Sequence, residues 1–77
     1  MVSVQSDAEF QERLGARIRK MRMERGISQE AFADDCGIHR THQSLLERGK
    51  INVKINTLRL VTKTLRVSLS ELVRGLG

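Results

Sequence analysis

Three groups of side chains in this 77-residue sequence are of types that could carry chemistry. Cys36, His39 and His42 are soft metal ligands spaced by three residues, and Asp34 and Asp35 are neighbouring carboxylates of the kind used in acid–base catalysis. The third group is a run of basic side chains between residues 40 and 66. Positive charge gathered in one segment suits a polyanion such as the phosphate backbone of a nucleic acid.

Neither metal binding nor catalysis is expected from the first two groups. Gly37 and Ile38 favour a turn that breaks the helix needed to gather the three ligands, and the fourth ligand of a structural zinc site is missing. Cys36 is therefore expected to be a small buried hydrophobe. On a helix, Asp34 and Asp35 point about 100° apart and cannot share a substrate. With no nucleophile–base spacing and no glycine-rich phosphate loop, the sequence predicts no enzyme, no metal and no cofactor.

The basic run holds all of the net charge of +5. Residues 1–39 carry six basic and seven acidic side chains, residues 40–66 carry seven and one, and residues 67–77 carry one of each. A solvated basic face is the alternative to a polyanion-binding surface. The seven cations are Arg40, Arg48, Lys50, Lys54, Arg59, Lys63 and Arg66.

The composition also bears on where the protein works. The N-terminal stretch MVSVQSDAEF is acidic and has no apolar run, and no segment approaches the roughly 20 apolar residues that a membrane span needs. A single cysteine cannot form an internal disulfide. We therefore expect a cytoplasmic protein with no membrane partner.

The apolar spacing and the capping residues predict one all-α domain of five helices over residues 1–77. The first helix begins near Asp7, after the capping-box sequence Ser6-Asp7-Ala8-Glu9, and ends before Gly26. Ser28 is the N-cap of a short second helix, and a third runs from about residue 40 to Gly49. The apolar stripe of the first helix is Phe10, Leu14, Ile18 and Met21.

The second and third helices, about residues 28–48, have the layout of a helix-turn-helix, because two short helices flank a tight turn at Gly37. A fifth helix over about residues 68–76 opens on a second capping-box sequence, Ser68 to Glu71. The fourth helix carries the apolar stripe Ile55, Leu58, Val61 and Leu65.

Residues 13–73 resemble the lambda-repressor/Cro-like helix-turn-helix family, in the order and spacing of RIRKMR, GISQEAFA, the Gly37-Ile38 turn, ERGK and TLRLVTKTLRVSLSEL. Within that family, residues 39–52 look most like the small controller proteins of restriction-modification systems, although Asn52 stands where many relatives have proline. The resemblance implies a dimeric, sequence-specific regulator of transcription that binds a palindrome in double-stranded DNA, with no small-molecule ligand. A phage or plasmid repressor and an antitoxin-like protein-binding module remain as alternatives.

The resemblance makes the third helix the recognition helix, which enters the major groove of DNA with its N-terminal residues at the base edges. Arg is suited to guanine, and a Thr hydroxyl or methyl to several base edges. The expected base-reading residues are Arg40, Thr41, Ser44 and Leu45. The expected phosphate-binding residues are Ser28, Gln29, His39, His42, Arg48, Lys50, Asn52 and Lys54.

Two further roles come from the resemblance. Arg22 and Glu47 are expected to form a structural ion pair beneath the recognition helix, with solvent exposure of both as the alternative. Periodicity alone would bury His42, Leu45 and Leu46, whereas the family register turns Leu45 toward DNA and Gln43 and Leu46 inward. Because a buried amide without partners is costly, we expect Gln43 at the margin of the core, bonded to its neighbours.

The last helix is expected to form the dimer interface, through Leu69, Leu72, Val73 and Leu76. Of these, Leu69 and Leu72 would also close the core of the monomer, while Val73 and Leu76 would pack on a second copy. Two-fold symmetry would then place two recognition helices about one DNA turn, roughly 34 Å, apart. A monomer with a frayed end is the alternative.

Overall fold

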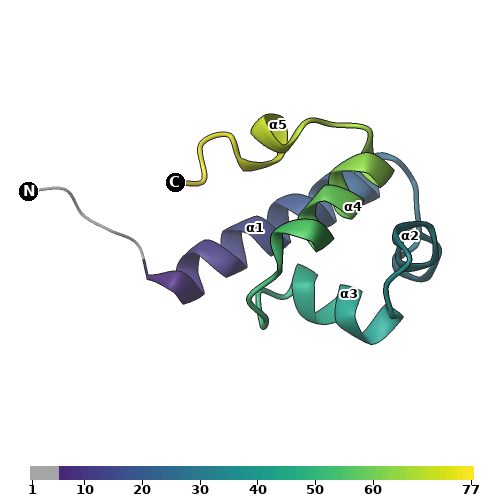
Figure 1. Ribbon diagram of the computed structural model, residues 1–77, viewed down its shortest axis with the longest axis horizontal. Coiled ribbons are helices and arrows are strands. Elements are labelled where there is room, and N and C mark those ends of the chain that lie inside the picture. The colour runs from purple at the N-terminus through teal and green to yellow at the C-terminus, as the bar shows by residue number, and fades with distance from the viewer. Residues whose placement is uncertain (1–5) are drawn as a thin grey trace, which may run out of the picture.

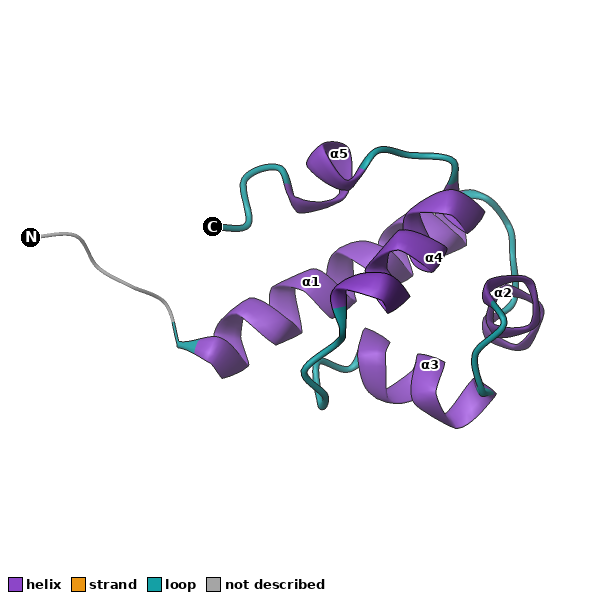
Figure 2. Ribbon diagram, viewed as in Figure 1, coloured by secondary structure: helices purple, strands orange, loops and turns teal. Residues whose placement is uncertain are grey.

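The computed structural model describes residues 6–77, and Met1 to Gln5, which belong to the acidic N-terminal stretch, lie outside the described residues. Over residues 6–77 the chain is built of helices and loops alone, which confirms the all-α prediction (Figure 2). None of these helices is long and apolar enough to cross a membrane. The helices are α1 (Asp7–Glu24), α2 (Gln29–Cys36), α3 (Arg40–Glu47), α4 (Ile55–Leu65) and α5 (Leu69–Val73).

The helices begin where the sequence places capping residues. The hydroxyl oxygen of Ser28 accepts from the Ala31 N–H at 3.1 Å, so α2 starts one residue later. At α5 the capping box is complete, because Ser68 accepts from the Glu71 N–H and the Glu71 carboxylate accepts from the Ser68 N–H. Lys54, in contrast, makes no side-chain cap at the start of α4.

A single apolar core is formed where α1 and α4 meet the other helices (Figure 1). Every helix contributes at least one fully buried side chain. The predicted stripe of α4 is wrong at Ile55, whose side chain is 59% exposed because the first residue of the helix projects away from the core. Central members of the core are Ile18, Phe32, Leu46, Val61, Leu65 and Leu72.

Two glycines allow α1 and α3 to approach closely. A Cβ atom at Gly15 would overlap the carbonyl oxygen of Leu46, and one at Gly49 would lie 2.5 Å from the Cα of Glu12. Gly49 also has φ 69°, which strongly favours glycine. The end of α3 is therefore fixed against the backbone of α1, and this contact sets the direction in which α3 presents its outer face.

Two arginines of α1 fasten α5 and the C-terminal residues to the core. Arg13 donates to the carbonyl oxygens of Leu76 and Gly75, both at 2.9 Å. Arg17 donates to those of Leu72 and Arg74, both at 3.1 Å. These bonds satisfy one carbonyl group in the last turn of α5 and those of the three residues that follow it.

The predicted division of the C-terminal side chains is wrong for Leu69, expected in the core, and for Leu76, expected in the interface. Leu72 and Leu76 are 0% and 3% exposed and belong to the core of the single chain, whereas Leu69 is 38% exposed. Leu72 lies three residues from Leu69 but on the side of α5 that the arginine contacts turn toward α1. Of the four residues assigned to a dimer interface, Leu69 and the half-buried Val73 are accessible to a partner.

Candidate nucleic-acid interface

Helices α2 and α3 form the helix-turn-helix. α2 ends at Cys36 and is capped by Gly37, which has φ 74° and whose N–H donates to carbonyls of the last turn. Ile38 follows, half-buried against the core, and donates from its N–H to the Ala33 carbonyl. In Figure 1, α3 runs along the lower edge while α2 is seen nearly end-on, so the turn redirects the chain steeply. The turn predicted at Gly37-Ile38 is confirmed.

The start of α3 is capped by a histidine. The imidazole Nδ1 of His39 accepts from the Thr41 N–H at 3.0 Å. Next to this cap, Arg40 and Thr41 are exposed, and Ser44 and Leu45 are partly exposed one turn further along. The four residues predicted to reach base edges therefore lie outside the core, on the first two turns of one helix.

The inner face of α3 follows the family register. Leu46 is 2% exposed and Gln43 is 0% exposed, whereas His42 is exposed, contrary to what simple periodicity indicates. The adjacent Leu45 is only partly buried. Leu46 therefore faces the core, while Leu45 keeps part of its surface exposed to solvent.

The ion pair expected beneath the recognition helix is present. Arg22 donates from Nε to Glu47 Oε2 at 2.7 Å and from Nη2 to Glu47 Oε1 at 2.9 Å. The third nitrogen, Nη1, donates to the Ile27 carbonyl at 2.7 Å. The two side chains are 10% and 2% exposed, so the pair is structural and joins α1 to the end of α3.

Burial by itself would raise the pKa of Glu47, but its hydrogen bonds outweigh this effect. The bonds from Arg22 and Gln43, together with the positive charge of Arg22 and a bond from Gln29, lower the pKa of Glu47 below its usual value. Glu47 is therefore a carboxylate over the physiological range.

The prediction that Gln43 lies at the margin of the core is wrong, because its side chain is fully buried. Its Nε2 donates to Glu47 Oε2 at 2.7 Å. Its Oε1 finds no hydrogen-bond partner among residues 6–77. The carboxylate one turn further along α3 supplies the acceptor that makes the burial of this amide tolerable.

Ser28 and Gln29, expected to meet a phosphate, also make contacts within the protein. The Ser28 hydroxyl accepts from the Ala31 N–H, which leaves its own proton free to donate outward. Gln29 donates from Nε2 to Glu47 Oε1 at 3.3 Å, and an amide nitrogen has a second proton to offer. Both groups thus keep a donor at the start of α2.

Several of the expected phosphate-binding residues lie together. A hollow of about 500 Å³ between α3 and the start of α4 includes His39, His42, Asn52 and Lys54 in its lining. Thr57, at the third position of α4, adds a hydroxyl that the charge pattern could not reveal. Arg48 and Lys50 are exposed at the other end of α3. The structure thus brings four of the eight predicted residues to one place.

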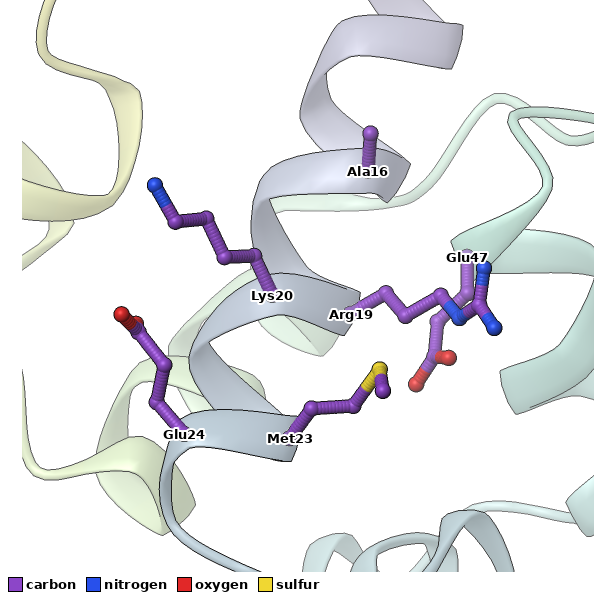
Figure 3. Close-up of a pocket in the computed structure, with 6 residues that line it drawn as sticks. All are labelled: Ala16, Arg19, Lys20, Met23, Glu24 and Glu47. Atoms are coloured by element: carbon purple, nitrogen blue, oxygen red, sulfur yellow. The ribbon is translucent and has the colours of Figure 1, made fainter.

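Arg19, a cation outside the basic run, also lies beside α3. In Figure 3, Arg19 and Met23 project from α1 on the side of Glu47, whereas Lys20 and Glu24 project on the other side. These residues line an open hollow of about 520 Å³. Charge counting along the chain missed Arg19 because it belongs to α1, although its position three residues before Arg22 puts it on a neighbouring face.

The side chains just before Gly37 include one buried thiol and two exposed carboxylates. Cys36 is 3% exposed and its thiol donates to Thr64 Oγ1 at 3.2 Å. Burial, with a contribution from the Asp35 carboxylate, raises the pKa of the Cys36 thiol, so it is a poor nucleophile. Across residues 6–77, His, Cys, Asp and Glu side chains form no group of three that could hold a metal ion. Asp34 and Asp35 are exposed.

Comparison with known proteins identifies the family. Residues 18–72, well over half of the chain, match the helix-turn-helix family. The chain belongs to that family. The helix-turn-helix described above is accordingly a DNA-binding unit, and this helix-turn-helix protein is a DNA-binding regulator of transcription. The family comprises regulators and not enzymes.

The helix-turn-helix chain is similar to control proteins along most of its length. It is 39% identical over 61 residues to "Control protein C.MunI" of Mycoplasma sp, covering 78% of this chain and 82% of that protein. It is 33% identical over 69 residues to "Control protein C.SmaI" of Serratia marcescens, covering 90% of this chain and 82% of the relative.

Solved structures agree with this likeness. The restriction-modification controller protein C.AhdI from Aeromonas hydrophila has a TM-score of 0.78 and 31% identity, over 84% of this chain and 97% of that one. The controller protein C.Esp1396I has a TM-score of 0.79 and 33% identity, over 87% of both chains. The helix-turn-helix protein thus resembles controllers in fold as well as in sequence.

Proposed function

We propose that this protein is a homodimeric controller of a restriction-modification system, which occupies a palindromic operator in double-stranded DNA. The observation that carries the proposal is the construction of α3, whose outer side offers Arg40, Thr41, Ser44 and Leu45 while its inner side is fixed by the Arg22–Glu47 pair. The similarity to control proteins over 78% and 90% of the chain supports the controller assignment.

Direct recognition of bases would come from the outer side of α3. Arg40 can donate two hydrogen bonds to O6 and N7 of guanine, the most frequent specific contact in the major groove. Thr41 and Ser44 can bond to base edges through their hydroxyls, and Leu45 can contact a thymine methyl group. These contacts select the sequence, while the phosphate contacts fix the position of the domain.

Phosphate contacts would come from both sides of α3. Ser28 and Gln29 supply donors at the N-terminal end of α2, where the helix dipole also favours an anion. The hollow lined by His39, His42, Asn52 and Lys54, with Arg48 and Lys50 beyond the end of α3, supplies the others. Each neutralised phosphate should add about 0.9 to the slope of log affinity against log salt.

The dimer would form through Leu69 and Val73, which lie four residues apart and so share one face of α5. Leu72 and Leu76 contribute indirectly, because their burial and the bonds from Arg13 and Arg17 fix α5 against α1. A symmetric pair would present two α3 helices to successive major grooves about 34 Å apart. The dimer would act at promoters in the cytoplasm.

Selection from a pool of random duplexes tests this proposal. Repeated binding and amplification should enrich a two-fold symmetric sequence whose half-sites lie about 10 base pairs apart or a multiple of that spacing. A single asymmetric half-site would contradict the dimer, and a pool that stays random would contradict sequence-specific binding. The enriched duplex is called the selected operator below.

A further inference from the structure

The guanidinium of Arg40 already has a partner in the free protein. Its Nη1 lies 3.3 Å from Oε2 of Glu30, which belongs to the first turn of α2. The pair joins the two helices of the helix-turn-helix across the turn at Gly37. Both side chains are well exposed, at 65% and 67%, so solvent, a base or a phosphate can compete for either group.

The Glu30 carboxylate lies near the start of α2, where a phosphate of DNA is otherwise expected. Glu30 follows directly after Ser28 and Gln29, the donors proposed for a phosphate at the start of α2. A negative charge there repels a phosphate that approaches Arg40, since like charges a few ångströms apart interact unfavourably. A guanine edge carries no net charge, so the same carboxylate opposes its approach far less.

We propose that Glu30 is a specificity-determining residue, which keeps Arg40 from binding phosphates on random DNA and leaves it for guanine. The proposal rests on the DNA-binding function proposed above. An exposed ion pair adds little net free energy, whereas a bidentate arginine–guanine contact discriminates strongly against the other bases. Guanine therefore displaces Glu30 from Arg40 or binds beside it. On random DNA the pair persists, and Arg40 contributes little to affinity.

The test is Glu30→Gln, which removes the charge and keeps the size of the side chain. The matched control is Asp34→Asn, which removes one exposed negative charge from the same helix. Affinities are measured for the selected operator and for a duplex of the same composition in scrambled order, over a series of salt concentrations. Circular dichroism checks that each variant is folded.

For Glu30→Gln we expect affinity for the scrambled duplex to rise roughly two- to fivefold more than for Asp34→Asn. Its salt slope on that duplex should steepen by about 0.9, because Arg40 now neutralises one more phosphate. The ratio of operator to scrambled affinity should fall. When Arg40→Ala is also present, the gain from Glu30→Gln on the scrambled duplex should shrink, and the salt slope should match that of Asp34→Asn.

Two results would overturn the inference while leaving the proposed function intact. In the first, the wild type prefers its operator, but Glu30→Gln and Asp34→Asn have the same affinities for both duplexes. The other is an equal gain on operator and scrambled DNA, with an unchanged affinity ratio. A wild-type protein that shows no preference for any duplex would overturn both the inference and the proposed function.

Discussion

At the scale of single residues, the Glu47 carboxylate organises the site. It accepts two hydrogen bonds from Arg22, one from Gln43 and one from Gln29, and these donors come from α1, α3 and α2. Both oxygens are therefore fully used, and the positions of three helices depend on one side chain. Such a buried pair fixes geometry more than it adds net stability, although removing one partner strongly destabilises the fold.

The pH dependence of stability should reveal this pair. Because the pKa of Glu47 is lowered in the folded state, its contribution is complete above the ordinary glutamate pKa of about 4.3 and is lost as the pH falls toward the folded value. Thermal unfolding of the wild type from pH 6 to pH 3 should therefore show a fall below about pH 4.3 that Glu47→Gln lacks.

The same variant should lose about 3–5 kcal/mol at neutral pH, because Arg22 is left buried without its partner. Glu24→Gln, which changes an exposed glutamate of α1, serves as the control and should keep the wild-type profile. A Glu47→Gln profile parallel to that of the wild type would mean that the pair contributes nothing to the acid sensitivity.

Gln43 offers a second test at this scale. Gln43→Met keeps the volume, removes an unpartnered carbonyl oxygen and removes one donor to Glu47, so opposing effects of about 1–3 kcal/mol should nearly cancel. Gln43→Glu should be strongly destabilising, because it buries a second carboxylate beside Glu47. Chemical denaturation measures both. A Gln43→Glu variant as stable as the wild type would contradict the contact described here.

At the scale of elements, α3 has two faces with separate duties. Leu46 packs in the core beside the backbone of α1, whereas Leu45 is only partly buried. The Leu46 carbonyl lies where a Cβ of residue 15 would be, so α3 packs directly on the backbone of α1. The face that α3 offers to DNA is therefore decided by a contact with another helix.

Alanine substitutions at the two adjacent leucines should separate these duties. Leu46→Ala should cost about 2–5 kcal/mol of stability, whereas Leu45→Ala should cost much less and lower affinity for the selected operator more than for scrambled DNA. Thermal unfolding and binding titrations of the two variants decide the matter. Equal destabilisation with unchanged specificity for Leu45→Ala would place Leu45 in the core.

Local chemistry explains which parts of the fold could be predicted from the sequence. Ser28, Gly37 and Ser68 mark helix ends through bonds to residues a few positions away, so they can be recognised one at a time. The burial of Gln43 could not be predicted in this way, because it depends on a carboxylate held by an arginine from α1. A helix of eight residues is too short for its apolar periodicity to decide whether Leu45 or Leu46 is buried.

The candidate site likewise depends on contacts between residues that are far apart in the sequence. The Arg22–Glu47 pair was predicted from family resemblance, since 25 residues separate the partners and no local pattern links them. The roles of Leu69 and Leu76 were interchanged because they depend on how Arg13 and Arg17 hold the C-terminal carbonyls. The assignments of single residues to bases and phosphates stay predictions, because they concern DNA and not the contacts of the chain.

At the scale of the whole molecule, the proposed dimer couples its two DNA contacts. A small domain buries only roughly 60% of the surface of its unfolded chain, so an exposed apolar face gains from association. The partly exposed face of Leu69 and Val73 belongs to α5, and α1 holds this helix and the three residues after it through four hydrogen bonds. A dimer built on α5 would therefore fix the orientation of the two cores, and of the α3 helix on each, relative to one another.

A charge on this face should separate the copies. Leu69→Glu should shift the protein to a monomer in sedimentation experiments and weaken binding to a full operator far more than to a half-site. The control is Leu60→Glu, which adds the same charge at another exposed leucine, 43% exposed on α4, and should leave the dimer intact. A Leu69→Glu variant that sediments like the wild type would exclude this face as the interface.

If α3 reads the sequence while the residues around it hold phosphates, Arg40→Ala and Lys50→Ala should behave differently on selected and scrambled duplexes across salt concentrations. Arg40→Ala should cost about 1–3 kcal/mol on the selected operator and little on scrambled DNA. Lys50→Ala should weaken both equally and reduce the salt slope by about 1. Equal losses on both duplexes for Arg40→Ala would contradict base recognition by α3.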